Sequence, residues 1–176
     1  MFLKWLNARI VYVPSLMWNV LLGRLLKTRD WWNRIDQRVL LGALPFSRDV
    51  DKLSSEGVGA VVNICEEYAG PIRKYEELGI KQLRIPTIDF TSPALKDVER
   101  AVEFMNRHIA DGNSVYVHCK AGRGRGATVV ICWLIQNKQI SAASAQQWVK
   151  QFRPQINDLV HRPVIRKFEQ QYLLQS

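Results

Sequence analysis

The stretch around Cys119 constrains the fold more than any other part of the chain. It reads SVYV over residues 114–117, HCKAGRGRG over 118–126 and ATVVICWLIQNK over 127–138. The apolar runs on either side predict a strand over 114–117 and a helix over 125–138, and the glycines predict a tight turn between them. A strand that enters a helix through a glycine-rich turn is typical of an α/β layer, whose ligands bind at the carboxyl ends of the strands.

Strand and helix signals also alternate through the rest of the chain beyond residue 30. Further strands are predicted over 38–44, 59–65 and 81–85, and further helices over 48–57, 92–112, 141–153 and 163–174. In the longest helix, Ser92 is the expected N-cap and Pro93 opens the first turn. Its expected buried face consists of Val98, Ala101, Val102, Met105 and Ile109. The alternation predicts an α/β fold with a central, mostly parallel sheet flanked by helices.

Composition limits the number of domains and the class of partner. The chain has 176 residues and is 47% hydrophobic, so it can bury one core and is too short for two ordinary domains. The net charge of +9 favours anionic partners such as phosphoesters, nucleic acid or acidic lipid, without choosing among them.

Cysteine and histidine usage argues against disulfides and metals. The three cysteines are widely spaced and form no CxxC pair, which argues against a disulfide framework and a zinc site and fits a reducing compartment. Cys65 and Cys132 lie in apolar segments and are expected to be core thiols. His108 and His161 have no partner at ligand spacing, so no metal site is predicted.

The first 29 residues are distinct because they carry cations and no acid. The cations are Lys4, Arg9, Arg24, Lys27 and Arg29. The apolar run over 10–22 is interrupted by Pro14 and is shorter than the roughly 20 residues needed to cross a bilayer. Polar positions recur every fourth residue as a narrow stripe, formed by Ser15, Asn19, Gly23 and Lys27. The remaining surface is apolar, so we expect an amphipathic N-terminal helix.

Three interpretations of this leader remain open. It can lie in a membrane interface, serve as a mitochondrial presequence, or pack on the core. In each case we divide the chain into a leader over residues 1–29 and a domain over residues 30–176 that carries the chemistry.

The chemistry is expected at Cys119, which lies between a strand and a helix N-terminus. The positive end of the helix and the adjacent cations favour thiolate over thiol at this position. The cations and the neighbouring histidine are His118, Lys120, Arg123 and Arg125. Glycines 122, 124 and 126 allow backbone amides to turn toward a bound oxyanion, and Arg125 can hold two of its oxygens. A thiolate facing such a cradle predicts transfer of a phosphoryl group to sulfur.

The sequence HCKAGRGR resembles the signature loop of the protein tyrosine phosphatase superfamily, in its compact dual-specificity branch. The resemblance implies that Cys119 is the nucleophile, that Arg125 holds the phosphate, and that neither a metal nor another cofactor takes part. It also implies a substrate-binding loop formed by His118, Lys120, Ala121, Gly122, Arg123 and Gly124. Within that loop, His118 is expected to act by orientation, while Lys120 and Arg123 either steer substrate or are solvated cations.

Two further stretches, RDWWNRIDQRVLLGALP over 29–45 and NICEEY over 63–68, resemble the family of mitochondrial phosphatases that remove the terminal phosphate of phosphatidylglycerophosphate, a step toward cardiolipin. The resemblance implies an anionic phospholipid substrate and no nucleic acid partner. It also implies peripheral contact with an anionic membrane, on the matrix side of the inner mitochondrial membrane. A phosphoprotein or phosphoinositide phosphatase of dual specificity is the alternative.

An alcohol leaving group also requires a general acid. Asp89, in the stretch PTIDFTSP, follows a predicted strand in a loop where the superfamily carries its mobile acid, and it is our preferred candidate. Glu66 and Glu67 also follow a strand and remain alternatives.

The residue after Arg125 departs from the superfamily pattern. That position usually holds Ser or Thr, and here it is Gly126. A slower second step is expected, unless Thr128 or a water supplies the missing hydrogen bond. A weakly active phosphate-binding module is therefore a further alternative.

Overall fold

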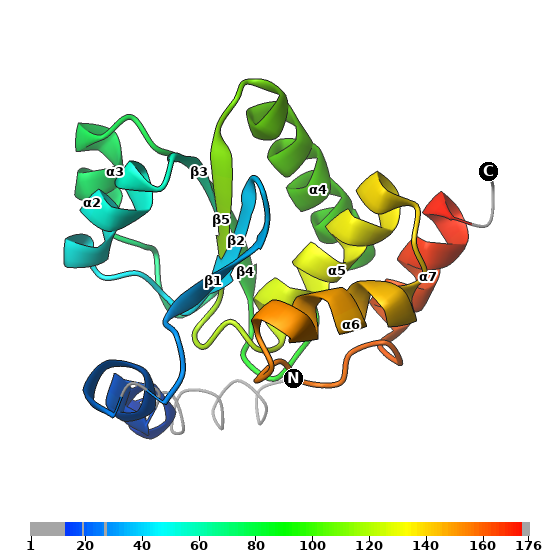
Figure 1. Ribbon diagram of the computed structural model, residues 1–176, viewed down its shortest axis with the longest axis horizontal. Coiled ribbons are helices and arrows are strands. Elements are labelled where there is room, and N and C mark those ends of the chain that lie inside the picture. Colours follow the sequence, from blue (N-terminus) through cyan, green and yellow to red (C-terminus); the bar gives the residue numbers. More distant parts are fainter. Residues whose placement is uncertain (1–12, 19, 27, 174–176) are drawn as a thin grey trace.

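The computed structural model describes residues 13–18, 20–26 and 28–173, in which helices cover both faces of a central sheet (Figure 1). The five strands are β1 (Trp32–Asp36), β2 (Val39–Gly42), β3 (Val58–Cys65), β4 (Lys81–Thr87) and β5 (Ser114–His118), in the spatial order β1-β2-β5-β3-β4. Only β1 is antiparallel to its neighbour, so the expected mostly parallel sheet is confirmed. Because the other four strands are parallel, the segments that follow them meet at one edge of the sheet.

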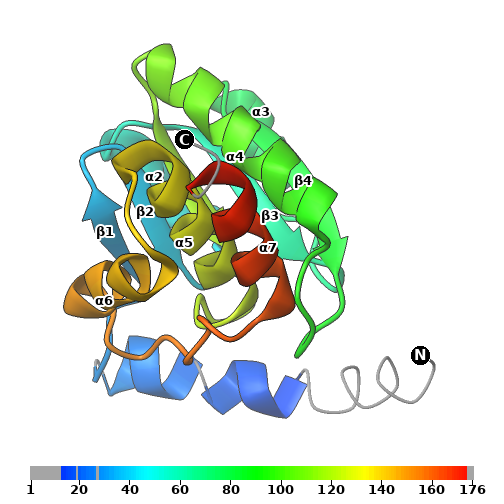
Figure 2. The ribbon, with the colours of Figure 1, turned by 90° about the vertical axis from the view of Figure 1, so that its right-hand side faces the viewer.

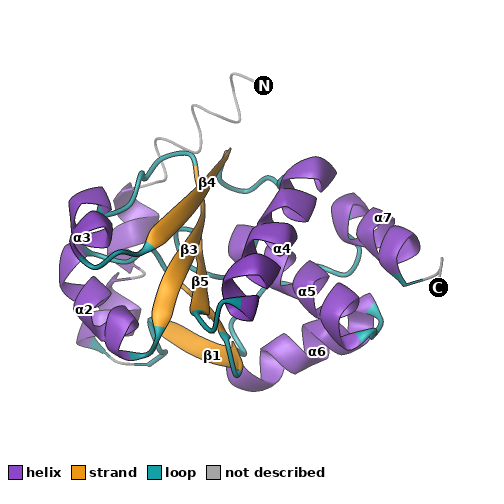
Figure 3. Cartoon of the chain, turned by 90° about the horizontal axis from the view of Figure 1, so that it is seen from above, coloured by secondary structure: helices purple, strands orange, loops and turns teal. Residues whose placement is uncertain are grey.

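Four helices cover one face of the sheet and two short helices cover the other (Figure 3). The larger group consists of α4 (Leu95–Ala110), α5 (Arg125–Lys138), α6 (Ala142–Phe152) and α7 (Pro163–Tyr172). The smaller group consists of α2 (Ser47–Ser55) and α3 (Ile72–Glu77). Residues 125–135 of α5 are all buried, which explains why that helix is almost continuously apolar. Its N-terminus is therefore held firmly against the edge where the parallel strands end.

The leader lies across that end of the domain, as the blue segment at the bottom of Figure 2. It contains a helical segment over residues 13–18 and the π-helix η1 (Leu21–Leu25). The two described members of its polar stripe face the domain: Ser15 accepts a hydrogen bond from Lys120 Nζ at 2.8 Å, and a Cβ on Gly23 would lie 2.9 Å from the ring of Trp31. The leader thus contacts the domain through its polar side, whereas a helix packed on the core would use its apolar side.

Four apolar side chains of the leader point outward instead, while Leu16, Val20, Leu21 and Leu22 are partly buried. Val13, Met17, Trp18 and Leu26 are all more than half exposed. The two other members of the expected polar stripe, Asn19 and Lys27, lie outside the described residues. In the described ranges no helix is long and apolar enough to cross a membrane.

Two elements were not expected from the sequence, and one boundary prediction was wrong. The unexpected elements are β1, an edge strand rich in polar residues, and α3, which is too short for a periodic signal. The helix predicted from Ser92 begins instead at Leu95, with Ala94 as its N-cap. The chain before it forms a turn in which Thr91 donates from both its backbone N–H and its hydroxyl to the carbonyl of Ile88. This turn projects Asp89 toward the active-site edge.

Candidate active site

The loop between β5 and α5 is fixed on the end of β2 by a contact between two glycines. Gly122 has a φ of 64°, and a Cβ built on it would lie 2.4 Å from the carbonyl oxygen of Gly42. A residue with a side chain does not fit at position 122, because the positive φ is unfavourable for it and its Cβ would collide with the backbone of Gly42. Gly124 and Gly126 have negative φ values, so Gly122 alone of the three loop glycines is required by backbone conformation.

The sulfur of Cys119 lies inside this loop and accepts hydrogen bonds from three backbone N–H groups, those of Ala121, Gly122 and Gly126. Burial by itself would raise the pKa of the thiol. The positive charge of Arg125 and the three N–H groups outweigh burial and lower the pKa of Cys119 below its usual value. The arrangement therefore favours a thiolate surrounded by donors that can also bind phosphate oxygens.

Arg125 is buried at the start of α5, and its guanidinium is held by three acceptors. Nη1 and Nη2 bind the two carboxylate oxygens of Glu67 at 2.8 and 2.7 Å, and Nη1 also donates to the carbonyl of Thr87 at 2.7 Å. Burial alone would lower the pKa of Arg125, but the hydrogen bonds to Glu67 and the Cys119 thiolate raise it. The guanidinium is therefore always charged and has a fixed orientation beside the sulfur.

The three candidate acids differ in their position. Asp89 forms ion pairs with Lys120 and with Arg125, whose Nη2 lies 2.9 Å from its Oδ1. Among the described residues, those that line the cavity over Cys119 include Asp89 but neither Glu66 nor Glu67. Glu67 is instead bound to Arg125, so its position favours an orienting role. Of the three candidates, Asp89 is therefore the one that lies in the cavity over Cys119, and its role as the acid stays a prediction.

The remaining loop residues fall into two groups. Lys120, Ala121, Arg123 and Gly124 line the cavity, where they can meet a substrate. His118 is fully buried beneath the loop, with its ring stacked on Tyr116 at a centroid distance of 5.6 Å. Burial lowers the pKa of His118 to about 3, so the ring is neutral. His118 does not line the cavity, and its place beneath the loop suits the orienting role expected for it.

The other two cysteines are completely buried, as expected for core thiols. Burial raises the pKa values of both Cys65 and Cys132. Cys119 is therefore the one thiol of the three whose surroundings favour the thiolate.

Arg153 is a structural support that the sequence did not reveal. It is 1% exposed, and it donates to the carbonyls of Ala121 and Gly122, both at 2.9 Å, and to Asn33 Oδ1 at 2.6 Å. By holding these carbonyls away from the sulfur, Arg153 keeps the adjoining N–H groups turned toward it. In the sequence it resembles an ordinary cation at a helix end before Pro154, and no local pattern indicates its burial.

The cavity over Cys119 has a volume of about 300 Å³. Outside the loop of Cys119 and the loop of Asp89, it is lined by five residues that the sequence did not identify as site residues: Ser15, Trp18, Arg29, Asn157 and Arg162. None of them belongs to a recognisable motif. They come from the leader and from the segment before α7, which only the tertiary fold brings together.

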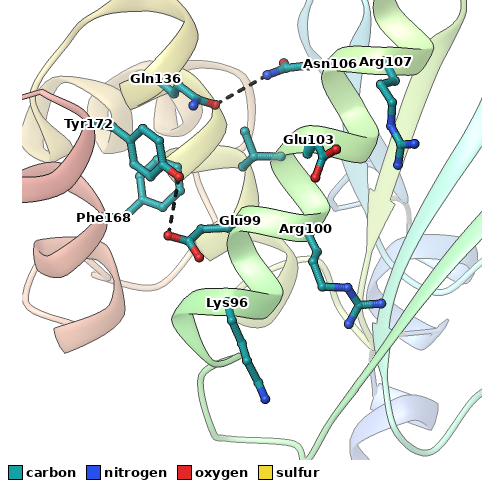
Figure 4. A pocket seen from close by; sticks show the side chains of 10 residues that line it. Lys96, Glu99, Arg100, Glu103, Asn106, Arg107, Gln136, Phe168 and Tyr172 are labelled. Atoms are coloured by element: carbon teal, nitrogen blue, oxygen red, sulfur yellow. Dashed lines mark hydrogen bonds between the residues drawn. The ribbon is translucent and has the colours of Figure 1, made fainter.

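A larger hollow lies between α4, α5 and α7 (Figure 4). Its polar groups are engaged with one another: Tyr172 Oη donates to Glu99 at 3.4 Å, and Asn106 donates to Gln136 at 3.5 Å. It contains no cysteine. Within the described part of the chain, no three His, Cys, Asp or Glu side chains gather to hold a metal ion.

Comparison with known proteins agrees with this geometry. Residues 39–171 match the dual specificity phosphatase catalytic domain family. The chain is 38% identical over 168 residues to the phosphatidylglycerophosphate phosphatase PTPMT2 of Arabidopsis thaliana, covering 92% of this chain and 73% of that protein. It is also 38% identical over 165 residues to phosphatidylglycerophosphatase and protein-tyrosine phosphatase 1 of Mus musculus, covering 87% of this chain and 86% of that protein.

A solved structure shows the same similarity. The crystal structure of PTPMT1 in complex with PI(5)P matches with a TM-score of 0.77 at 34% identity, covering 83% of this chain and 99% of that one. With a matching catalytic domain and relatives of this identity over most of its length, the chain belongs to the dual specificity phosphatase family, in the group of the phosphatidylglycerophosphate phosphatases.

Proposed function

We propose that this protein removes the terminal phosphate of phosphatidylglycerophosphate, giving phosphatidylglycerol and inorganic phosphate, through a phosphocysteine on Cys119. The observation that carries the proposal is the sulfur of Cys119, ringed by three backbone N–H groups and by Arg125 on the floor of a cationic cavity. The relatives named as phosphatidylglycerophosphate phosphatases support the substrate.

In the first step, the thiolate of Cys119 attacks phosphorus while the bond to the leaving oxygen breaks. Asp89 donates its proton to that oxygen, so that phosphatidylglycerol leaves with an uncharged hydroxyl group instead of an alkoxide. In the free protein Asp89 is paired with Lys120 and Arg125. A phosphate dianion competes for both cations, which releases the carboxyl group of Asp89 from its ion pairs beside the leaving oxygen.

In the second step, a water attacks the phosphocysteine and the thiolate is restored. The carboxylate of Asp89 accepts the proton of this water, which returns the acid to its starting state. The N–H groups of the loop and the guanidinium of Arg125 stabilise the phosphoryl oxygens in both steps. Glu67 acts through Arg125, by fixing its orientation.

The leader, residues 1–29, serves in this proposal as a peripheral membrane contact, separate from the phosphatase domain over residues 30–176. Its outward-facing Val13, Met17 and Trp18, together with Phe90 in the Asp89 loop, form an exposed apolar rim, and Trp18 and Phe90 also line the cavity. An apolar rim around a cationic pocket suits a lipid whose headgroup must enter the pocket while its acyl chains remain in the membrane. The acid-free cationic leader also supports a mitochondrial location, on the matrix side of the inner membrane.

A phosphoinositide is the second candidate substrate, because the structure of PTPMT1 in complex with PI(5)P has the same fold. Phosphate release from vesicles containing phosphatidylglycerophosphate, from vesicles containing PI(5)P and from a phosphotyrosine peptide separates the candidates. We expect kcat/KM to be at least about tenfold higher for phosphatidylglycerophosphate, and Cys119→Ser to release no phosphate from any of them. A preference for PI(5)P or for the peptide would overturn the proposed substrate.

A further inference from the structure

The cavity over Cys119 has a second cationic side, distinct from the loop that holds the reacting phosphate. We call this side the arginine flank, formed by Arg29, Asn157 and Arg162. Arg29 precedes β1, while Asn157 and Arg162 lie in the segment between α6 and α7, where Arg162 is the N-cap of α7.

The arginine flank adjoins the phosphate loop at Gly124. A Cβ built on Gly124 would lie 3.4 Å from Arg162 Nη2 and 3.6 Å from Asn157 Nδ2, so both donors lie over that glycine. The backbone N–H of Asn157 donates to the carbonyl of Arg123 at 3.0 Å, and Arg162 Nη1 donates to Thr128 Oγ1 at 3.3 Å. These bonds fix Asn157 and Arg162 relative to the loop.

No carboxylate lies within ion-pair distance of the flank's charges, in contrast to several other arginines of the described chain. Arg24, Arg100 and Arg125 each pair with an acid, whereas Arg29 and Arg162 form no ion pair with any carboxylate in the described ranges. Arg162 is partly buried, and this burial lowers its pKa while the Cys119 thiolate raises it. A partly desolvated guanidinium with a free edge toward a cavity is a site for an anion.

We infer that Arg162, assisted by Arg29 and Asn157, binds a second anionic group of the substrate, the phosphodiester that links the terminal glycerol phosphate to the diacylglycerol. This assignment rests on the proposed function. In phosphatidylglycerophosphate, the reacting monoester and the phosphodiester are joined by a single glycerol, so one small cavity can hold both. The planar fork of Arg162 can donate to the two free oxygens of the phosphodiester.

The inference makes the arginine flank the part of the site that determines specificity. A simple phosphate monoester needs only the loop, Arg125 and Asp89. A substrate that carries a phosphodiester next to its monoester gains a further charge-assisted contact. The flank therefore distinguishes glycerophospholipid headgroups from monoesters that lack the second anion.

Two soluble substrates, which both release an alkyl alcohol, test this distinction. Glycerol 3-phosphate carries the monoester alone, whereas the deacylated headgroup of phosphatidylglycerophosphate carries both phosphate groups. For Arg162→Gln we expect kcat/KM to fall roughly 10- to 100-fold on the deacylated headgroup, mainly through KM, and only about threefold on glycerol 3-phosphate. Arg162→Lys keeps the charge but not the planar guanidinium. Its kcat/KM on the deacylated headgroup should lie between those of Arg162→Gln and the parent.

Arg166→Gln is the matched control. Arg166 carries the same charge and lies in the first turns of α7, just after Arg162, but it is exposed and does not line the cavity. We expect it to lower both activities equally and by less than about twofold. Equal losses on the two substrates in Arg162→Gln, or no loss on either, would overturn the inference while leaving the proposed function intact. Failure of the parent protein to hydrolyse phosphatidylglycerophosphate itself would overturn the proposed function and this assignment with it.

Discussion

Two carboxylates contact the guanidinium of Arg125, and their surroundings give them different roles. Glu67 binds it through both oxygens and lies outside the cavity, whereas Asp89 lines the cavity and also meets Lys120. A proton donor must reach the leaving oxygen, so only Asp89 has the position for this task. Glu67 holds the phosphate-binding group in place.

The two roles predict different substrate dependence. Asp89→Asn should slow hydrolysis of an alkyl phosphate roughly 100-fold or more and slow a nitrophenyl phosphate less, because nitrophenolate leaves without protonation. Glu67→Gln should slow both substrates to a similar extent, because it loosens Arg125 in every reaction. Steady-state kinetics of the two variants on both esters provide the measurement. If Glu67→Gln slowed the alkyl phosphate more than the nitrophenyl phosphate, and Asp89→Asn slowed both equally, Glu67 would be the acid and Asp89 the orienting residue.

Gly126 leaves the sulfur without the hydroxyl that usually follows the arginine in this superfamily. The hydroxyl of Thr128 is not a ready substitute, because it donates to the carbonyl of Gly124 at 3.0 Å and accepts from Arg162. A Cβ at position 126 would lie 3.2 Å from Leu41 Cδ1, so a larger residue requires a small shift of that side chain. Breakdown of the phosphocysteine is therefore expected to be slow.

Rapid-quench kinetics with a nitrophenyl phosphate test this expectation. We predict a burst of nitrophenol in the parent protein, a smaller burst in Gly126→Ser and a steady-state rate that rises by roughly 10-fold or more. Gly126→Ala adds the same Cβ without the hydroxyl and should show no gain. If the parent shows no burst and the serine variant turns over no faster than the alanine variant, Gly126 does not limit turnover.

At the scale of single residues, local sequence was informative wherever a motif was present. The spacing of Cys119 and Arg125, and the position of Asp89 after a strand, were sufficient to predict that they share one site. Arg153 and Arg162 could not be predicted in this way. Their roles arise where a helix end meets a distant loop, and nothing in their neighbouring residues signals that contact.

Among the elements, the leader is the one whose orientation bears on the proposed membrane contact. Its polar side contacts the domain through Ser15 and Gly23, and its apolar side faces outward next to the cavity. We predict that Val13→Glu combined with Met17→Glu weakens binding to anionic vesicles by roughly tenfold or more and alters hydrolysis of a soluble nitrophenyl phosphate less than twofold. Vesicle flotation measures the first effect.

The control for the leader introduces the same charges elsewhere. Ile72 and Leu78 are also exposed apolar residues, but they lie on and next to α3, away from the leader. Changing both to Glu should reduce vesicle binding only slightly. Removal of residues 1–27 should weaken binding more than the double substitution does. Unchanged flotation after that removal would contradict a membrane role for the leader.

Elements with strong periodicity were predicted well, and those without it were not. The boundaries of α5 were predicted to the residue because its apolar run follows the glycine-rich turn directly and gives way to the polar residues 136–138 in its last turn. β1 lies at the sheet edge, where the alternation of apolar and polar residues is weak. α3 has little more than one turn, too few residues to show a helical period. The start of α4 was misplaced because Ser92 and Pro93 form a good cap in isolation, while the turn that carries Asp89 uses the chain before them.

For the whole molecule, buried His118 makes stability depend on pH. Its pKa is lowered to about 3 by burial, whereas an unfolded histidine has a pKa of about 6.5. Between these values the unfolded chain binds the additional proton, so stability falls as the pH decreases from about 6.5, approaching about 1.4 kcal/mol per pH unit from this group.

Two measurements test this dependence. The ring protons of His118 should show no titration above about pH 4 in an NMR experiment. His118→Phe, which keeps an aromatic ring on Tyr116, should have a flatter dependence of unfolding free energy on pH between about 6 and 4. A ring that titrates near pH 6.5, or an unchanged slope in the variant, would show that His118 is not the group responsible.

In the proposed reaction, one thiolate of this molecule accepts the terminal phosphate of phosphatidylglycerophosphate. Acid quenching within the first turnover on vesicles of that lipid, followed by mass-spectrometric mapping of the phosphorylated peptide, tests this step. We expect phosphate on Cys119, formed together with an equal amount of phosphatidylglycerol and absent in Cys119→Ser. Phosphatidylglycerol formed without a phosphocysteine, or with the phosphate on another residue, would contradict it.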